Sequence, residues 1–173
     1  MGLINGLFLK NLSSCESLLN SYNFIQSKEY VLNHPYYGPI SKVILDYQHY
    51  WIAFLYPGFV TLSVVHYGEV ISSEVMVSNG SRKQHGVGNA ILGGVLFGPA
   101  GAIIGHNASK VTGTIEDIRL KVVTINQKSP LILMKFIKEP VDRKSATVQR
   151  VLSYCEQVNA VLQGLIYQNQ GRR

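Results

Sequence analysis

Residues Gly86 to His106 read G-V-G-N-A-I-L-G-G-V-L-F-G-P-A-G-A-I-I-G-H, and we call this stretch the glycine segment. It contains no Asp, Glu, Lys or Arg, and small residues recur in it at intervals of four. Residues four apart lie on one helix face, and a face without side chains lets another backbone come close. The pattern therefore predicts self-association through five small residues: Ala90, Gly94, Gly98, Gly101 and Gly105.

The glycine segment is a poor helix former in water. Its five glycines from Gly93 to Gly105 give up roughly 4 to 5 kcal/mol of helix propensity, so the helix needs something packed against it. Pro99 breaks the segment into two halves, which predicts a glycine-rich helical hairpin. We favour packing on protein, either its own domain or a second copy. Membrane contact or insertion and a merely flexible loop are the alternatives left open.

Basic or titratable residues flank the glycine segment on both sides. If the segment is a hairpin, these flanks meet at its base and predict an anion-binding or partner-binding site. The simpler interpretation, solvated charges that end an apolar segment, is favoured over it. The flanking residues are Arg82, Lys83, His85, His106 and Lys110.

Composition fits one domain with an appendage. Of the 173 residues 46% are hydrophobic and only 15% are charged, with a mean hydropathy of +0.11, which predicts apolar surface for a partner or lipid. The net charge of +6 permits anionic partners, but no long basic run predicts sequence-specific nucleic-acid binding. Cys15 and Cys155 are far apart with no CxxC motif, which predicts reduced, structural cysteines and a cytoplasmic protein, with membrane association left open.

The remainder of the chain predicts helices at both ends and strands between them. Hydrophobic spacing indicates an amphipathic helix over 13–30, followed by a loop or linker at His34–Pro39. A long amphipathic helix is expected at 145–169. Six strands are predicted, four of them as a meander before the glycine segment and two after it: 43–47, 51–56, 60–67, 72–77, 114–125 and 131–137.

These elements predict an α+β fold: a small antiparallel sheet or barrel, capped by the long C-terminal helix and preceded by an N-terminal helix. Strand pairing would bring Val77 near Thr114, so the glycine segment is interpreted as an insertion between neighbouring strands. The expected divisions are an N-terminal helix and Pro-rich linker (1–41), the β-domain with its final helix (42–169), the insertion within that domain (84–110) and a short tail (170–173).

No catalytic or cofactor motif is present in the sequence. The dinucleotide fingerprint and the phosphate loop both fail, and the histidines lack metal-ligand spacing, so no cofactor or metal is expected. Asp46 and His49 could meet in a loop, whereas Cys155 lies on the apolar stripe of the last helix and is interpreted as core. The six aromatic residues around the first strands could form a stacking platform or an interface, but an aromatic core is favoured: Tyr36, Tyr37, Tyr47, Tyr50, Trp51 and Tyr56.

The segment V-V-H-Y-G-E-V-I-S-S-E-V-M-V (Val64–Val77) resembles the strand, aromatic-acidic-apolar turn and following strand of bacterial pleckstrin-homology-like domains. The pair of strands from Ile115 to Ile137 and the final helix are similar to their closing portion. Small proteins of this kind in Gram-positive bacteria and their phages often carry a glycine-zipper insertion before the last strands, which the glycine segment resembles. The zinc-ribbon cysteines of some relatives are absent. The resemblance implies binding rather than catalysis and does not fix the ligand.

The expected function is that of a non-enzymatic binding or scaffold protein. It would self-associate as a homo-oligomer, or engage a membrane surface or a protein partner, through the glycine-zipper hairpin. The alternative is a phage-type inhibitor of a host defence system, which sequesters a nucleotide signal or blocks a defence enzyme with Arg82, Lys83, His106 and Lys110 supplying positive charge.

Overall fold

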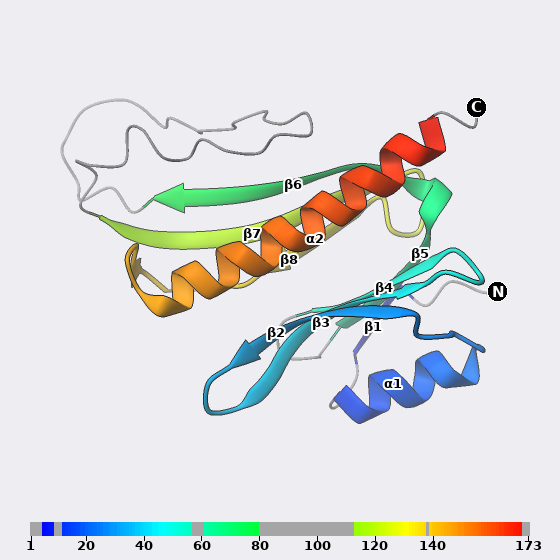
Figure 1. Ribbon diagram of the computed structural model, residues 1–173, viewed down its shortest axis with the longest axis horizontal. Helices are drawn as coiled ribbons and strands as arrows, with labels where there is room; N and C mark the ends of the chain where they lie inside the picture. Colours follow the sequence, from blue (N-terminus) through cyan, green and yellow to red (C-terminus); the bar gives the residue numbers. More distant parts are fainter. Residues whose placement is uncertain (1–4, 9–11, 57–60, 80–112, 138, 171–173) are drawn as a thin grey trace.

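The computed structural model describes residues 5–8, 12–56, 61–79, 113–137 and 139–170, and it confirms the α+β architecture (Figure 1). Two antiparallel sheets face each other, with a short N-terminal helix outside the first sheet and a long C-terminal helix beside both. In chain order the elements are β1 (Asn5–Phe8), α1 (Leu12–Ser21), β2 (Lys28–His34), β3 (Gly38–Asp46), β4 (Trp51–Leu55), β5 (Thr61–His66), η1 (Tyr67–Glu69), β6 (Val70–Asn79), β7 (Thr114–Thr124), β8 (Leu131–Lys135), β9 (Val141–Asp142) and α2 (Ala146–Gln170).

Sheet A has the strand order β1-β5-β4-β3-β2, so the first three predicted strands do form a meander. The predicted N-terminal helix was too long, because α1 stops at Ser21 and Asn23 takes a positive φ of 55°. The Ser27 N–H then donates to the Leu45 carbonyl at 2.8 Å, and the chain continues as β2. The expected linker at His34–Pro39 is instead the tight turn of the β2–β3 hairpin and the start of β3.

Sheet B has the order β6-β7-β8, with β9 paired to β7. The fourth predicted strand therefore does not extend the meander, since the turn η1 carries the chain from β5 in sheet A to β6 in sheet B. The expected neighbourhood of Val77 and Thr114 is confirmed, because β6 and β7 pair antiparallel with Val77 opposite Ile118 and Asn79 opposite Ile115. The glycine segment thus connects two neighbouring strands.

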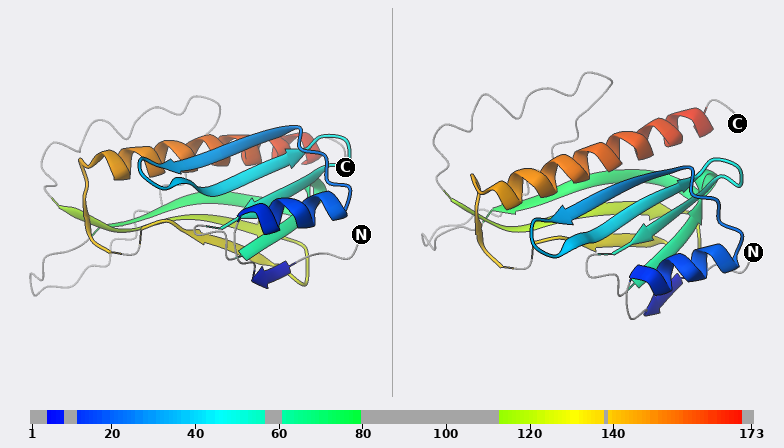
Figure 2. Two further views of the ribbon diagram at one scale, coloured as in Figure 1. Left: turned by 90° about the horizontal axis from the view of Figure 1, so that it is seen from below. Right: turned by 60° about the horizontal axis from the view of Figure 1, so that its bottom comes forward.

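Helix α2 matches the predicted C-terminal helix almost residue for residue. The Ser145 hydroxyl accepts from the Val148 N–H at 3.2 Å, which satisfies one free donor of the first turn. The helix lies along the open side of the two sheets, between β2 and β6 (Figure 2), and buries one apolar stripe in the main core. The buried residues of this stripe are Val148, Val151, Tyr154, Cys155, Val158, Leu162 and Ile166.

A second, smaller core lies on the outer face of sheet A. There α1 places Cys15 and Leu19 against outward-facing residues of β3, β4 and β5, including Ala53. Strand β4 is consequently buried on both faces, so its sequence lacks the alternation of a half-exposed strand. At the edge of this layer the Lys42 ammonium contacts Glu16 at 3.0 Å and Glu29 at 3.1 Å.

Candidate functional site

The two strands that precede and follow the glycine segment in the sequence are paired at one end of sheet B. Strand β6 ends at Asn79 and β7 begins at Thr114, on the left in Figure 1, and the two strands are paired. Strand β9 extends this end, since Val141 lies opposite Ile115 and the Arg143 N–H donates to the Gly113 carbonyl at 3.3 Å. The segment therefore leaves and re-enters the folded body at adjacent positions, as an inserted appendage would.

All ten residues that the sequence predicts as sites fall between residues 80 and 112, outside the described residues. These are the self-association residues Ala90, Gly94, Gly98, Gly101 and Gly105, and the anion-binding or partner-binding residues Arg82, Lys83, His85, His106 and Lys110. Their roles stay predictions.

Paired charges cover the outer face of sheet B beneath the attachment point. Asp117 on β7 forms an ion pair with Arg119, and the Lys135 ammonium lies 3.9 Å from the same carboxylate. The neighbouring Lys121 ammonium lies 2.6 Å from Glu74. Each of these three basic residues has an acidic partner, so we assign none of the three to an anion-binding site.

The body that carries the appendage is tied together by polar contacts between α2 and sheet B. The Ser73 hydroxyl donates to Asn159 Oδ1 at 2.7 Å, and the Gln163 amide donates to the Ser73 carbonyl at 2.6 Å. Near the end of the helix, the Asn169 amide donates to the Tyr67 carbonyl at 2.9 Å. These bonds fix the helix in both position and rotation relative to the sheet.

The aromatic-acidic turn after β5 has a structural role. His66 Nδ1 accepts from the Gly68 N–H at 3.1 Å, and the Glu69 carboxylate accepts from the His66 N–H at 2.9 Å. The Asn126 amide also donates to Glu69, from the loop after β7. This reciprocal capping holds the corner where the chain passes between the sheets.

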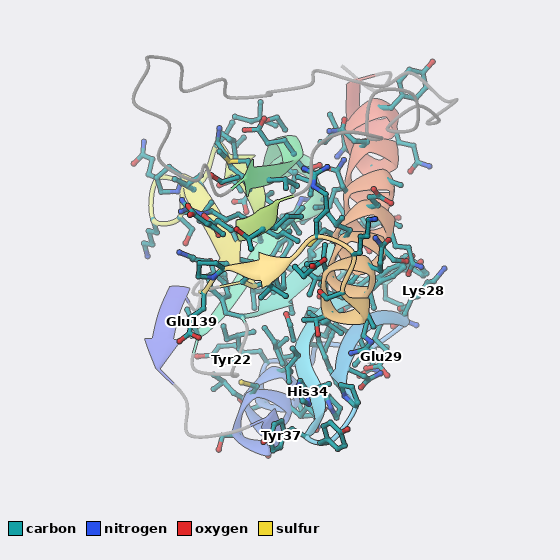
Figure 3. All side chains as sticks on the ribbon, turned by 90° about the vertical axis from the view of Figure 1, so that its left-hand side faces the viewer. Tyr22, Lys28, Glu29, His34, Tyr37 and Glu139 are labelled. Atoms are coloured by element: carbon teal, nitrogen blue, oxygen red, sulfur yellow. The ribbon has the colours of Figure 1, made fainter. Side chains whose placement is uncertain are left out.

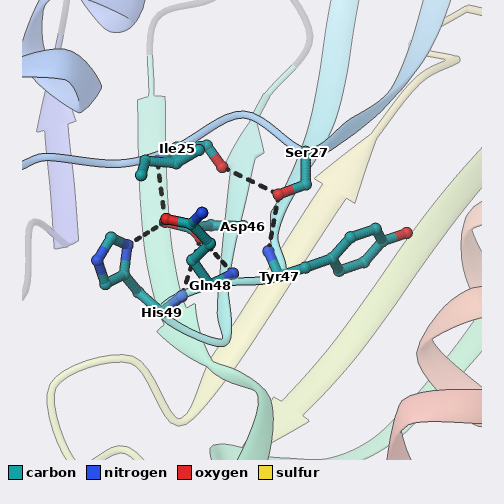
Figure 4. A network of polar contacts seen from close by, with 6 residues as sticks. All are labelled: Ile25, Ser27, Asp46, Tyr47, Gln48 and His49. Atoms are coloured by element: carbon teal, nitrogen blue, oxygen red, sulfur yellow. Dashed lines mark hydrogen bonds and ion pairs between the residues drawn. The ribbon is translucent and has the colours of Figure 1, made fainter.

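Asp46 and His49 do meet, as expected, in the turn between β3 and β4 (Figure 4). The buried Asp46 carboxylate accepts from the backbone N–H groups of Ile25, Gln48 and His49, each at 2.9 Å, and lies 2.8 Å from His49 Nδ1. Burial alone would raise the pKa of Asp46, but these hydrogen bonds outweigh it and lower the pKa. The carboxylate therefore serves as a fixed acceptor that holds the turn.

The cysteines lie in the two cores, as the sequence predicts. Burial raises the pKa of the Cys155 thiol to about 12, so at neutral pH it is protonated and a weak nucleophile. Cys15 is also buried, and neither cysteine forms a disulfide. Within the described ranges no group of three or more His, Cys, Asp or Glu side chains is placed to hold a metal ion.

The favoured prediction of an aromatic core is wrong for four of the six aromatic residues. Tyr36 and Tyr37 are 88% and 80% exposed, and His34 stacks on Tyr37 with ring centroids 4.6 Å apart. Tyr47 and Tyr50 are 49% and 51% exposed. The reason is that all four occupy the turns of the β2–β3 and β3–β4 hairpins and not the strands themselves; Figure 3 shows His34 and Tyr37 at the first of these turns.

A pocket of about 410 Å³ lies at the other end of the molecule, where α2 ends. The β3–β4 turn, η1 and the C-terminal half of α2 form its walls. Sequence reasoning missed it, although the one glycine inside the predicted final helix, Gly164, was a usable signal. The lining residues are Leu45, Tyr47, Tyr50, Tyr67, Val161, Gly164, Leu165, Gln168 and Asn169.

Helix length gives no sign of a membrane span: in the described part of the chain no helix is long and apolar enough to cross a bilayer.

Neither the curated proteins nor the solved structures contain a match to this sequence. Residues 27–138, well over half of the chain, match the family described as "Glycine zipper containing PH domain". The match spans β2 to β8 and includes the glycine segment, so the chain belongs to the family of PH domains that contain a glycine zipper.

Proposed function

We propose that this PH domain is a non-enzymatic binding or scaffold protein that associates with further copies of itself through the glycine segment. The observation that carries the proposal is the pairing of β6 with β7, which brings the strand before the segment and the strand after it together at one end of the folded body. The described strands of sheet B pair with one another without a strand from residues 80–112, which supports a role for the segment outside the sheet.

The sequence of the segment favours a second copy as the partner. A face of small residues is complementary to an identical face, because two backbones can approach each other only where neither carries a bulky side chain. A two-fold arrangement uses the same patch on both chains and closes after two subunits. A membrane surface or a different protein is the competing partner, and the basic flanks Arg82, Lys83, His85, His106 and Lys110 would meet its anionic groups.

The experiment is to measure molar mass by light scattering for the full chain and for the double variant Gly94→Leu with Gly98→Leu. The proposal predicts that the full chain has a mass of at least two copies of the 19.2 kDa chain and that the double variant has the mass of one. Ser153→Leu, an exposed position on α2, is the matched control and keeps the mass of the full chain.

Two further outcomes count against self-association. An unchanged mass in the double variant would remove the small-residue face from the contact. A full chain that is monomeric in buffer but sediments with vesicles of anionic phospholipid would identify lipid as the partner instead. The nucleotide-sequestering alternative is tested separately: it predicts that the purified protein carries a bound nucleotide, which adds absorbance at the wavelength where nucleobases absorb.

A further inference from the structure

The pocket at the end of α2 has the volume of a small-molecule site. Its volume of about 410 Å³ falls within the range of roughly 300 to 1,000 Å³ that is usual for ligand pockets. Leucine, valine and tyrosine side chains make up most of the wall, with two amide side chains, Gln168 and Asn169, on one side. None of the described residues that line it carries a charge, so the wall suits an uncharged ligand group.

Three tyrosines provide flat surfaces in this wall. The rings of Tyr50 and Tyr67 meet edge to face, with centroids 5.9 Å apart and an interplanar angle of 81°. Tyr67 is buried, and burial raises the pKa of its phenol, which is therefore neutral at physiological pH. Tyr47 and Tyr50 are only half-buried, which leaves part of each ring available for stacking by a planar group.

Gly164 keeps one side of the pocket open. It lies in the interior of α2, where glycine is a poor helix former, yet a Cβ placed on it would meet no atom within 4 Å. No neighbour therefore requires a glycine here for close packing. A large side chain at this position would enter the pocket, so the glycine preserves its volume.

The two amides supply hydrogen-bonding groups at the rim. Asn169 uses its amide N–H to donate to the Tyr67 carbonyl at 2.9 Å, which orients its side chain and leaves Oδ1 as an acceptor. The exposed Gln168 amide offers a donor and an acceptor together. A donor and an acceptor side by side match the edge of a heteroaromatic ring.

We propose that this pocket binds an uncharged heteroaromatic ring of the nucleobase type. The ring would stack on Tyr47 and Tyr50, while Gln168 and Asn169 hydrogen-bond to its edge. A nucleoside and a nucleotide present the same ring and differ in the phosphate. The proposal is independent of self-association, because the pocket lies at the opposite end of the body from Asn79, where β6 ends, and Thr114, where β7 begins.

The test is isothermal titration of the full chain with adenosine, guanosine, cytidine and uridine. At least one nucleoside is expected to bind saturably with one site per chain. Tyr47→Ala should weaken that binding about tenfold or more, since one stacked ring is lost. Gly164→Leu should abolish it by filling the pocket, whereas Ser153→Leu, three turns earlier on α2, should bind like the unsubstituted chain.

Thermal unfolding of each variant by circular dichroism confirms that the substituted chains are folded. Saturable binding that Gly164→Leu removes and Ser153→Leu retains supports the proposal. Absence of saturable binding by all four nucleosides overturns it, and so does full binding by a folded Gly164→Leu chain. The monophosphate of the nucleoside that binds then identifies the source of the ring: equal or weaker affinity indicates a nucleoside, and tighter binding indicates a nucleotide.

Discussion

Replacing residues 80–113 with a four-residue turn that contains Asn-Gly should leave a folded and more stable body. The replaced residues join the ends of β6 and β7, which are already paired with Asn79 opposite Ile115. An Asn-Gly turn matches the twist of such a hairpin. All the described residues of the two cores lie outside the replaced range and are retained in the variant.

The expected gain follows from loop closure. Closing a flexible loop costs about (3/2)RT ln n, so shortening the connection from roughly 34 residues to about 4 lowers this cost by about 2 kcal/mol. A second variant with a Gly-Ser linker of the original length isolates this term, because it keeps the loop length and removes the apolar side chains that lie between the glycines of the segment. The short-turn variant should therefore exceed the linker variant by about 2 kcal/mol in free energy of unfolding.

The assay is urea denaturation followed by the fluorescence of Trp51, the single tryptophan, at a concentration where the full chain is monomeric. Under these conditions the linker variant should match the full chain within about 0.5 kcal/mol. A short-turn variant that fails to fold would refute the reasoning. So would a linker variant that is less stable than the full chain by 2 kcal/mol or more, because the glycine segment would then be packed on its own body.

Three further predictions concern the described body. Asp46→Ala should lower the free energy of unfolding by about 2 kcal/mol at pH 7, because three backbone N–H groups, those of Ile25, Gln48 and His49, lose their charged acceptor. The lowered pKa of Asp46 means that its ionised form favours the folded state. The unsubstituted chain should therefore lose this contribution to stability as the pH falls below the ordinary carboxyl pKa of about 3.9, whereas the Asp46→Ala chain has no such contribution to lose. The urea midpoints of both chains at pH 7 and pH 3 measure the difference. Gly164→Ala should raise the free energy of unfolding by about 0.8 to 1 kcal/mol, since the added Cβ meets open space, and a lower unfolding temperature would contradict this. Cys155 should react with a thiol reagent only after denaturant is added. The absorbance of a chromogenic thiol reagent should therefore stay constant with the native protein and rise when denaturant is added.

Local patterns predicted most of the body. The apolar stripe of α2 and the alternation of β7 carry their periodicity in the sequence, β4 and β5 are short apolar runs between turn residues, and the structure places all four as expected. The stretch around Tyr30 was predicted wrongly as helix, because the spacing of its apolar residues fits a helix face as well as a strand. Pairing of Tyr30 with Val43 on β3 decides the matter, and such a tertiary contact is invisible to a local pattern.

The passage from β5 to β6 shows the same limit. Gly68 and Glu69 correctly indicated a turn, but an ordinary hairpin and a corner between two sheets have similar sequences. Long-range contacts hold it as a corner, among them that of Asn126 with Glu69, 57 positions earlier in the chain. The pocket at the end of α2 was missed for a related reason, since Tyr47, Tyr67 and Gly164 meet only through the packing of α2 beside the sheets.

Contact between the glycine segments of two chains can be measured directly by disulfide trapping. Both natural cysteines are buried, so a cysteine introduced by Ala90→Cys is the reactive thiol, and Ser153→Cys on the exposed side of α2 is the control. Under mild oxidation at micromolar concentration, self-association predicts that the Ala90→Cys chain forms a disulfide-linked dimer much faster than the Ser153→Cys chain. Equal rates of dimer formation in the two variants would contradict the account.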